Sequence, residues 1–265
     1  MSINLLNLIY FSPTGTTRKV LESIAKGIAP SMIEFTDLSG TGAEFCFDKN
    51  QPDLAVIGIP TYASRIPPEA ANLFKRLYGN RIPVVLVAVY GNNKFGDILL
   101  EMKDIAISGG FVPIAAAAFI GEHSFSTKDK PIAAGRPDVQ DINDAEKFGE
   151  LIRRKMLEDD LNLLNKDLKV PGDSPYREWH KIPAQPPTIN KDLCIKCNTG
   201  KLACPVNAIS ITDAVLTNAD LCIFCCACVK QCPVSARTIT DLTLLNAQER
   251  LFNSCSERKK PEIFL

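Results

Sequence analysis

Short hydrophobic runs alternate with segments of helical spacing through the first 157 residues of the chain. Two of these runs, Asp53–Pro60 and Pro83–Tyr90, are almost unbroken, which is typical of strands that are buried on both faces of a parallel sheet. Three more runs have the length and composition of strands: Leu5–Phe11, Met32–Asp37 and Val112–Ile120. The pattern therefore predicts five strands in this part of the chain.

Apolar residues recur at helical spacing between the expected strands, notably over 20–28 and 142–156. A further helix is expected to begin at Pro67-Pro68, because proline is tolerated in the first turn. This alternation predicts a doubly wound α/β domain with helices on both faces of a parallel sheet. The segment Gly121–Gln140 is long for a connection in such a domain and is a candidate lid.

The pattern changes after residue 157, where the α/β domain, 1–157, is expected to end. Proline and glycine recur through 158–187, which predicts a semi-rigid linker. This stretch contains the only tryptophan, Trp179, which is expected to pack against one of the domains. Residues 188–241 hold most of the cysteines and are expected to form a second, smaller α+β domain, followed by a partly helical tail, 242–265.

Charge and cysteine content narrow the classes of function. Lys+Arg and Asp+Glu are each 30, and no basic face stands out, so nucleic acid is not an expected partner. The N-terminus lacks a positively charged signal region, and no apolar run suits membrane insertion, which favours a cytoplasmic protein. Eight of the ten cysteines lie between Cys194 and Cys232, which indicates metal or redox chemistry in a reducing compartment. The other two, Cys46 and Cys255, are expected to be small buried hydrophobic residues.

The cysteine-rich domain contains an internal repeat with an offset of 28 residues. Residues 190–213 and 218–241 share 13 identities over 24 aligned positions. The second copy reads Cys222-x2-Cys225-x2-Cys228-x3-Cys232-Pro, a run that binds iron–sulfur clusters and whose fourth cysteine serves the other cluster. The repeat therefore predicts two cluster sites that exchange one ligand each.

One predicted site has four cysteine ligands: Cys222, Cys225 and Cys228, with Cys204 from the first copy. We expect it to hold a [4Fe-4S] cluster. Zinc is the alternative, because Cys-x2-Cys pairs also bind zinc, and the protein would then be a zinc-stabilised interaction protein. The compressed triplet, the Cys-Pro ending and the duplication favour the cluster.

The other predicted site contains Cys194, Cys197 and Cys232, and its fourth position is Gly200, which offers no ligand. Three outcomes are open: a [3Fe-4S] cluster, a [4Fe-4S] cluster with one iron bound by solvent or another group, or no cluster. Cys226 is an extra thiol that could supply the missing ligand. The preferred interpretation is that Cys226 binds no iron.

The first expected strand is followed by Ser12-Pro13-Thr14-Gly15-Thr16-Thr17, which leads into a helix. Backbone N–H groups at a helix start bind phosphate and the hydroxyl groups add donors, although such loops are also ordinary helix caps. Two further loops, Thr61–Arg65 and Tyr90–Asn92, follow the third and fourth strands. These loops converge at the edge of the sheet where ligands bind in such folds.

Residues 1–157 resemble a flavodoxin, and residues 188–241 resemble a bacterial two-cluster ferredoxin. The whole chain is similar to the ferredoxin family that carries a flavodoxin-like N-terminal region. The resemblance implies a five-stranded sheet in the order 2-1-3-4-5, FMN as cofactor, and stacking of the flavin ring by Tyr62 and Tyr90. The cofactor-binding residues that it implies are Ser12, Thr14, Gly15, Thr16, Thr17, Thr61, Tyr62, Ala63, Ser64, Arg65, Tyr90, Gly91 and Asn92.

The expected function is electron transfer between the clusters and FMN, either as a carrier or as a reductase of a small acceptor at the flavin. A substrate-specific flavin reductase is the alternative, with a pocket near Glu122 and with His123 as a catalytic proton-transfer residue. As an enzyme, the chain would be an FMN- and Fe-S-dependent oxidoreductase. Expected partners are redox proteins or a small-molecule electron acceptor, and a homodimer is a further candidate.

Overall fold

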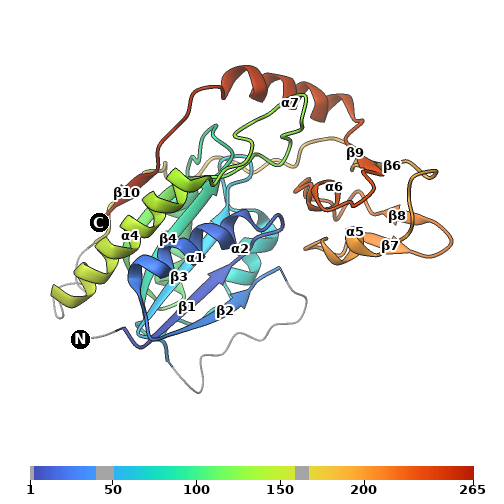
Figure 1. Cartoon of the computed structure of the whole chain (residues 1–265). Coiled ribbons are helices and arrows are strands. Elements are labelled where there is room, and N and C mark those ends of the chain that lie inside the picture. The colour runs from blue at the N-terminus through green and yellow to red at the C-terminus, as the bar shows by residue number, and fades with distance from the viewer. Residues whose placement is uncertain (1–2, 40–50, 159–166) are drawn as a thin grey trace.

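The computed structural model describes residues 3–39, 51–158 and 167–265. It consists of an α/β domain and, beside one end of its sheet, the small cysteine-rich domain (Figure 1). Cys46 and part of the expected linker lie outside the described residues. Within those residues, no helix is long and apolar enough to cross a membrane.

In the described residues the main sheet has six strands in the order β10-β5-β4-β3-β1-β2. The strands are β1 (Leu5–Tyr10), β2 (Met32–Asp37), β3 (Leu54–Pro60), β4 (Pro83–Tyr90), β5 (Val112–Ile120) and β10 (Glu262–Phe264). The first five are parallel, in the order 2-1-3-4-5, which confirms the predicted doubly wound architecture. The C-terminal tail adds a sixth strand that was not predicted, β10, which pairs antiparallel with β5. A strand of three residues is too short to show a hydrophobic period.

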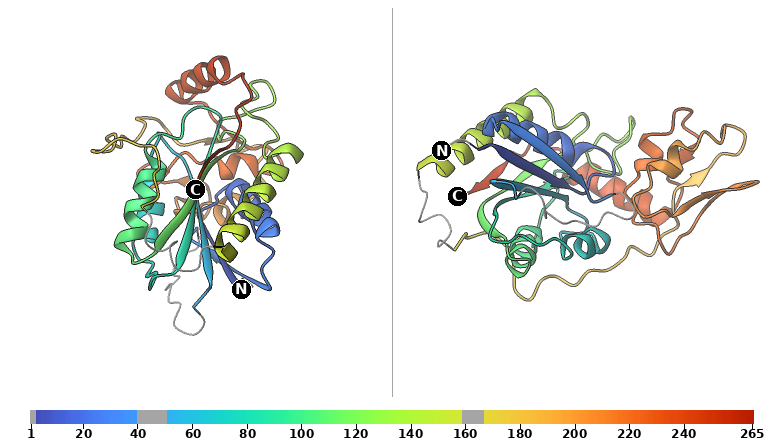
Figure 2. Two further views of the ribbon diagram at one scale, coloured as in Figure 1. Left: turned by 90° about the vertical axis from the view of Figure 1, so that its left-hand side faces the viewer. Right: turned by 90° about the horizontal axis from the view of Figure 1, so that it is seen from below.

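Helices cover both faces of this sheet. Helices α1 (Thr16–Ile28) and α4 (Val139–Glu158) pack on one face, and α2 (Pro68–Phe74) and α3 (Ile98–Ser108) pack on the other (Figures 1 and 2). Strands β3 and β4 are buried at almost every position because both of their faces are covered. This explains why their sequences are nearly unbroken hydrophobic runs.

Two glycines allow α1 and α4 to approach closely. A Cβ atom at Gly27 would lie 1.9 Å from the backbone oxygen of Glu146, and one at Gly149 would lie 2.1 Å from that of Ile24. Both obstacles are backbone atoms, which cannot move aside without shifting a whole helix. The packing of α1 on α4 therefore depends on these glycines.

Replacing Gly27 by valine is expected to lower the free energy of unfolding by about 3 kcal/mol, the upper end for overpacking in a core. The measurement is chemical denaturation followed by circular dichroism. The matched control is Glu150→Ala, an exposed position on α4, which we expect to change stability by less than about 0.5 kcal/mol. Equal denaturation midpoints for the two variants would show that the helices can separate without cost.

The C-terminal tail joins the two domains. Helix α7 (Leu242–Ser254) begins at Asp241, whose carboxylate accepts hydrogen bonds from two backbone N–H groups of its first turn. Leu244 and Leu251 of this helix are buried with Phe125 of the α/β domain and Phe224 of the cysteine-rich domain. These side chains form a third hydrophobic core at the contact between the domains. Cys255 is buried in the same core, as expected.

The segment Gly121–Gln140 is part of this contact, so the lid prediction is wrong. Phe125 and Ile132 are buried in the third core, where they are 6% and 1% exposed. The Gln248 side chain donates a 2.6 Å hydrogen bond to the backbone oxygen of Phe125. A lid opens by moving its apolar side chains out of their contacts. Here those side chains pack against a second domain, which would have to move as well.

The sequence repeat is also a structural repeat. Strand β6 (Thr188–Ile189) pairs with β9 (Arg237–Thr238), and β7 (Ile209–Ile211) pairs with β8 (Val215–Thr217). The short helices α5 (Thr199–Leu202) and α6 (Ala227–Lys230) occupy equivalent positions in the two copies and contact each other. Each copy thus contributes one strand to each of these two pairs. Strand pairing between the copies therefore holds this small α+β unit together.

Candidate functional site

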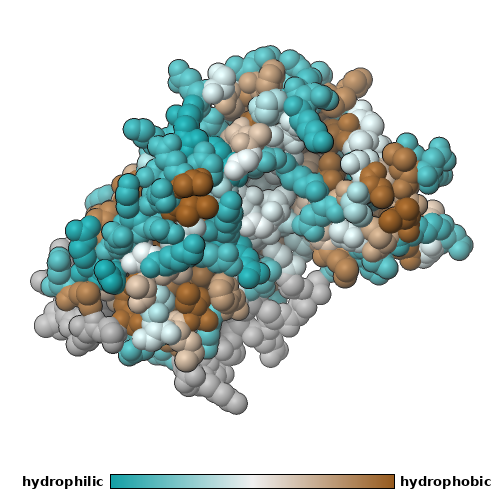
Figure 3. Space-filling view, viewed as in Figure 1, coloured by the Kyte–Doolittle hydropathy of each residue, from teal (hydrophilic) through white to brown (hydrophobic). Residues whose placement is uncertain are grey.

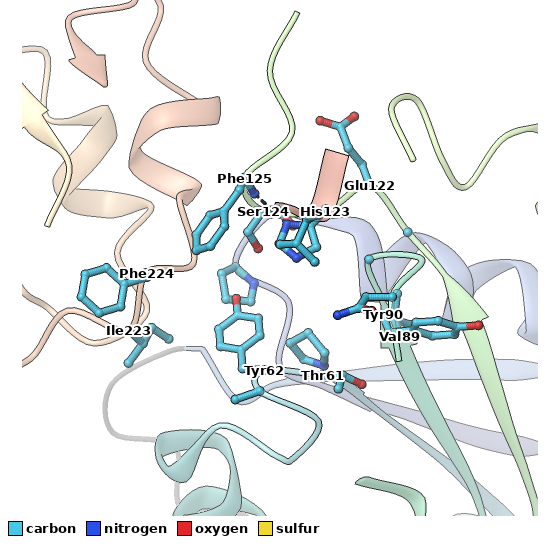
Figure 4. A pocket seen from close by; sticks show the side chains of 18 of the residues that line it. Thr61, Tyr62, Val89, Tyr90, Glu122, His123, Ser124, Phe125, Ile223 and Phe224 are labelled. Carbon is cyan, nitrogen blue, oxygen red and sulfur yellow. Dashed lines mark hydrogen bonds between the residues drawn. The ribbon is translucent and has the colours of Figure 1, made fainter. Parts of the chain in front are cut away.

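A cavity of about 350 Å³, here named the main cavity, lies at the carboxyl ends of β1, β3, β4 and β5. Its volume is typical of ligand pockets. The loops after these strands form its floor, and the linker, α7 and the Ile223-Phe224 segment of the cysteine-rich domain complete its wall (Figure 4). It therefore lies where ligands bind in doubly wound sheets, but a second domain helps to enclose it.

Three threonines of the loop after β1 line the main cavity: Thr14, Thr16 and Thr17. Gly15 precedes helix α1 with φ of +80°, and no atom lies within 4 Å of a Cβ built on it. The hydroxyl groups of Thr14 and Thr16 lie 3.2 Å apart. Open space, a helix start and convergent hydroxyl groups make this loop a suitable phosphate cradle. Ser12 has a supporting position, since its hydroxyl accepts a 3.1 Å hydrogen bond from the Arg18 N–H.

The loop after β3 contributes Thr61, Tyr62 and Ala63 to the main cavity. The ring of Tyr62 points into the cavity toward Ser124 (Figure 4). Burial and the nearby thiols of Cys225 and Cys226 raise the pKa of Tyr62 well above its usual value. Tyr62 thus lies between the main cavity and the cysteine-rich domain. Its predicted stacking on a ring stays a prediction.

Arg65 was predicted to bind the cofactor, but the structure does not bring it to the main cavity. Its guanidinium binds both carboxylate oxygens of Glu101 at 2.7 and 2.9 Å and lies over the ring of Tyr176 at 4.6 Å. It also donates a hydrogen bond to the backbone oxygen of Arg177. Arg65 therefore attaches the linker to α3. Its neighbour Ser64 lines a second cavity, described below.

Two residues of the loop after β4, Tyr90 and Asn92, were predicted to contact the cofactor. Tyr90 is 4% exposed, and its ring packs edge-on against Phe95, with centroids 5.5 Å apart. Tyr90 lines the main cavity, but its ring points away from it (Figure 4), and its predicted stacking stays a prediction. The buried amide of Asn92 donates hydrogen bonds to the backbone oxygens of Cys255 and Glu257, at 2.8 and 2.7 Å. Asn92 thus attaches the C-terminal tail and does not line the cavity.

Gly91 of the same loop supports His123. A Cβ atom on Gly91 would lie 2.3 Å from Cδ2 of His123, so only glycine leaves room for the imidazole. The Phe125 N–H donates a 3.0 Å hydrogen bond to Nδ1, which places the ring proton on Nε2. Burial, and secondarily the charge of Lys230, lower the pKa of His123 to about 4. The imidazole is thus a fixed neutral donor at neutral pH, and its predicted proton-transfer role stays a prediction.

Two residues of the main cavity carry a buried polar atom without a partner. Among the described residues, three buried side-chain atoms lack a hydrogen-bond partner, and two of them are Thr61 Oγ1 and Trp179 Nε1. Both residues line the main cavity. Buried polar groups in native proteins are nearly always hydrogen-bonded, so these two atoms are exceptions that lie in residues at the wall of the main cavity. The signal in the sequence was a lone tryptophan in a proline-rich linker, which alone does not show what it packs against.

The four cysteines of the complete predicted site meet at one small cavity in the cysteine-rich domain: Cys204, Cys222, Cys225 and Cys228. The Ala208 N–H donates to the Cys204 sulfur at 3.2 Å, and the buried Arg237 guanidinium donates to the Cys228 sulfur at 3.2 Å. Such donors to thiolate sulfur are one means by which proteins tune iron–sulfur clusters. These residues fit a cluster in both number and surroundings.

The second set is more exposed and has three cysteines. Cys194 and Cys232 are partly exposed and Cys197 is exposed. The Ala236 N–H donates to the Cys232 sulfur at 3.2 Å, the same contact that the first copy makes 28 residues earlier. Among the described residues, no group of three or more His, Cys, Asp or Glu side chains is placed to hold a single metal ion.

Two residues were considered for the fourth position of the three-cysteine site: Gly200, which occupies it in the repeat, and Cys226, the extra thiol. A Cβ at Gly200 would be in ordinary contact, 3.7 Å from Arg237 and from Cβ of Cys228. Cys226 is buried in the third hydrophobic core, with its sulfur 3.5 Å from the backbone oxygen of Phe224. The structure thus places Cys226 with the four-cysteine set and the domain contact.

The main cavity and the four-cysteine cavity share a wall. Ile223, in the loop between Cys222 and Cys225, lines both of them. The adjacent Phe224 lines the main cavity and packs in the third core. Hydrogen bonds hold the domains in this position, including one of 3.3 Å from the Gln231 side chain to the backbone oxygen of Pro13. The main cavity and the four-cysteine cavity are therefore adjacent, which the sequence alone did not predict.

Residues 215–238 match the family model of the 4Fe-4S binding domain. No curated protein matches the chain. Similar solved structures include a flavodoxin from the domain Archaea, with 13% identity over 58% of this chain and 99% of that one, at a TM-score of 0.43. A flavodoxin from Streptococcus pneumoniae has 16% identity over 57% and 99%, at a TM-score of 0.41. Rubredoxin oxygen:oxidoreductase from Desulfovibrio gigas has 14% identity over 59% and 37%, at a TM-score of 0.42.

The strand order of the sheet itself defines the class of the first domain. Parallel strands in the order 2-1-3-4-5, with helices on both faces, are the flavodoxin-like arrangement. The chain therefore joins a flavodoxin-like α/β domain to a 4Fe-4S binding domain. The family match at 215–238 also favours an iron–sulfur cluster over zinc in the second copy of the repeat.

Proposed function

We propose that this chain is an iron–sulfur flavoprotein that transfers electrons between a [4Fe-4S] cluster and FMN in the main cavity. The observation that carries the proposal is the wall formed by Ile223, which lines both sites. Cys204, Cys222, Cys225 and Cys228 would bind the cluster. Because the two sites are adjacent in one chain, electron transfer needs no encounter between separate molecules.

The residues around the main cavity fit FMN. The loop Thr14–Thr17 would hold the phosphate at the start of α1. Tyr62 and Trp179 would flank the ring, and the neutral His123 would donate a hydrogen bond to it through Nε2. FMN supplies a group that takes up two electrons and releases them one at a time. The linker and α7 line the cavity and would limit the access of water to the ring.

The three-cysteine site is proposed as the point where a redox partner docks. Five large hydrophobic residues of the cysteine-rich domain are exposed: Leu193, Ile195, Leu202, Leu216 and Leu221. Figure 3 shows hydrophobic side chains gathered on this domain. The first two flank Cys194, and Cys197 is itself exposed. A cluster bound by Cys194, Cys197 and Cys232 would therefore lie close to the surface, beneath apolar side chains suited to a transient protein contact.

Replacing Gly200 by cysteine is expected to complete the three-cysteine site. A side chain at this position meets no obstacle, and its place in the repeat corresponds to Cys228. EPR of the oxidised protein should lose any three-iron signal, and the reduced protein should show a four-iron signal that the unchanged chain lacks. Gly200→Ala is the control, because it adds the same Cβ without a thiol. Identical spectra for the two variants would mean that position 200 does not face a cluster.

The test of the proposed function begins with anaerobic purification and measurement of iron, sulfide and FMN. Electrons from a small chemical reductant are then followed by flavin absorbance and rapid-freeze EPR. We expect redistribution between cluster and flavin at a rate that does not depend on protein concentration, since both sites are in one chain. A rate that rises with protein concentration, or a protein without flavin, would contradict the proposal.

A further inference from the structure

A second cavity of about 380 Å³, here named the side cavity, lies beside the main cavity. The two cavities share several lining residues, among them Thr61, Gly91 and His123. A molecule in the side cavity would therefore lie directly next to whatever occupies the main cavity. The charged residues that line the side cavity show which chemical groups such a molecule must carry.

Three cationic residues from separate segments line the side cavity, and one of them, Arg250, also lines the main cavity. Lys94 follows β4, Arg177 belongs to the linker, and Arg250 is on α7. Among the described residues, none of these three side chains forms an ion pair or a hydrogen bond, whereas Arg65 and Arg258 are both paired with carboxylates. Charges that converge from three distant parts of the chain without partners indicate a site for an anion.

The side cavity has little negative charge in its lining, and hydrogen bonds hold the backbone of Arg177 in place. Among the described lining residues the one carboxylate is Glu178, which lies 3.5 Å from Nε2 of His180. The backbone of Arg177 is held on both sides: its N–H donates to Asp97 at 2.8 Å, and its oxygen accepts from Arg65. The Arg65 contact with the linker therefore supports the side cavity. The hydrogen bond from Arg65 holds the Arg177 backbone at this edge of the sheet.

His123 lies at the junction of the two cavities. Its Nδ1 accepts from the Phe125 N–H at 3.0 Å, so Nε2 carries the proton and can donate to an oxygen atom. The neutral state of the imidazole means that it adds a directional donor without adding charge. The cations attract an anion, and His123 can orient it.

We propose that the side cavity binds a small organic anion, carrying a carboxylate or phosphate group, directly beside the main cavity. Guanidinium groups bind both kinds of group through two parallel hydrogen bonds, and Lys94 adds a point charge. The inference rests on the proposed function, because the anion would lie next to the flavin that the main cavity is proposed to hold.

The test is isothermal titration calorimetry of the anaerobic, cofactor-loaded full chain with sodium succinate at constant ionic strength. We expect saturable binding, with a change in the flavin absorbance spectrum, and no binding of the uncharged analogue succinamide. Sodium phosphate in place of succinate distinguishes the two anion classes. Arg177→Gln and Arg250→Gln should each weaken binding about tenfold, as for loss of a charge-assisted hydrogen bond.

Arg154→Gln is the control, since it removes an exposed cation of α4 that does not line either cavity. Lys94→Gln is a second test should an arginine variant fold poorly. Absence of saturable binding by both succinate and phosphate, in protein with normal flavin and iron, overturns the anion site and leaves electron transfer intact. Protein that binds succinate but contains no flavin contradicts the proposed function instead.

Discussion

Replacing Cys225 by alanine is expected to remove the proposed [4Fe-4S] cluster and, with it, the proposed electron transfer from the cysteine-rich domain to the flavin. Cys225 is buried at the four-cysteine cavity, in the loop that carries Ile223. Loss of a residue that merely supports a metal ligand typically costs about 10–100-fold in metal affinity, and loss of a ligand itself should cost more. We therefore expect a loss of about four iron atoms per chain. Flavin reduction through the clusters should stop, while direct chemical reduction of the flavin continues.

The control for this prediction is the neighbouring Cys226. It is also buried and also lines the four-cysteine cavity, but it packs in the third hydrophobic core as well. Cys226→Ala should keep the iron content and the reduced EPR signal, with only a modest loss of stability. Iron analysis and EPR of the two variants decide the matter. If Cys226→Ala loses the cluster and Cys225→Ala keeps it, the ligand set derived from the repeat is wrong.

The double replacement Thr14→Val and Thr16→Val is expected to weaken FMN binding about 100-fold. Valine keeps the shape of threonine and removes the two hydroxyl groups, which lie 3.2 Å apart at the start of α1. A hydrogen bond to a charged group contributes about 1.5–3 kcal/mol, so each hydroxyl accounts for about tenfold in affinity. Fluorescence titration of the apoprotein with FMN measures the change.

Riboflavin, which lacks the phosphate, separates this effect from general damage to the cavity. Its affinity should be nearly the same for the double variant and the unchanged protein. Ser12→Ala is the matched control, because its hydroxyl binds the Arg18 N–H and supports the loop from outside the cavity. Equal weakening of riboflavin and FMN would mean that the loop shapes the cavity but does not bind a phosphate.

Most of the fold was predictable because its signals are local. Five strands were expected from hydrophobic runs, and each begins and ends within one residue of the expected position. Strand β10 was missed because three residues show no period, and its pairing depends on the distant β5. The lid prediction for Gly121–Gln140 failed for a similar reason, because the partners of Phe125 and Ile132 come from α7 and the second domain.

The sequence predicted which loops form the candidate site, but it did not predict which side chains of those loops line the cavity. The expected loops do converge on the main cavity, and Thr14, Thr16 and Tyr62 line it. Arg65 and Asn92 lie in the same loops but bind the linker and the C-terminal tail instead. Those partners are 112 and 163 residues away along the chain, so no local pattern could show that they occupy these side chains.

The sequence by itself determined the five parallel strands of the α/β domain, the duplication in the cysteine-rich domain, and the four cysteines that line one cavity there. These properties follow from backbone periodicity and from ligand spacing within a few residues, which hold in any context. Only the tertiary structure decided that Trp179 and Ile223 enclose the main cavity, and that Lys94, Arg177 and Arg250 converge beside it. Such neighbours come from separate segments, and their positions depend on how the two domains pack through a shared hydrophobic core.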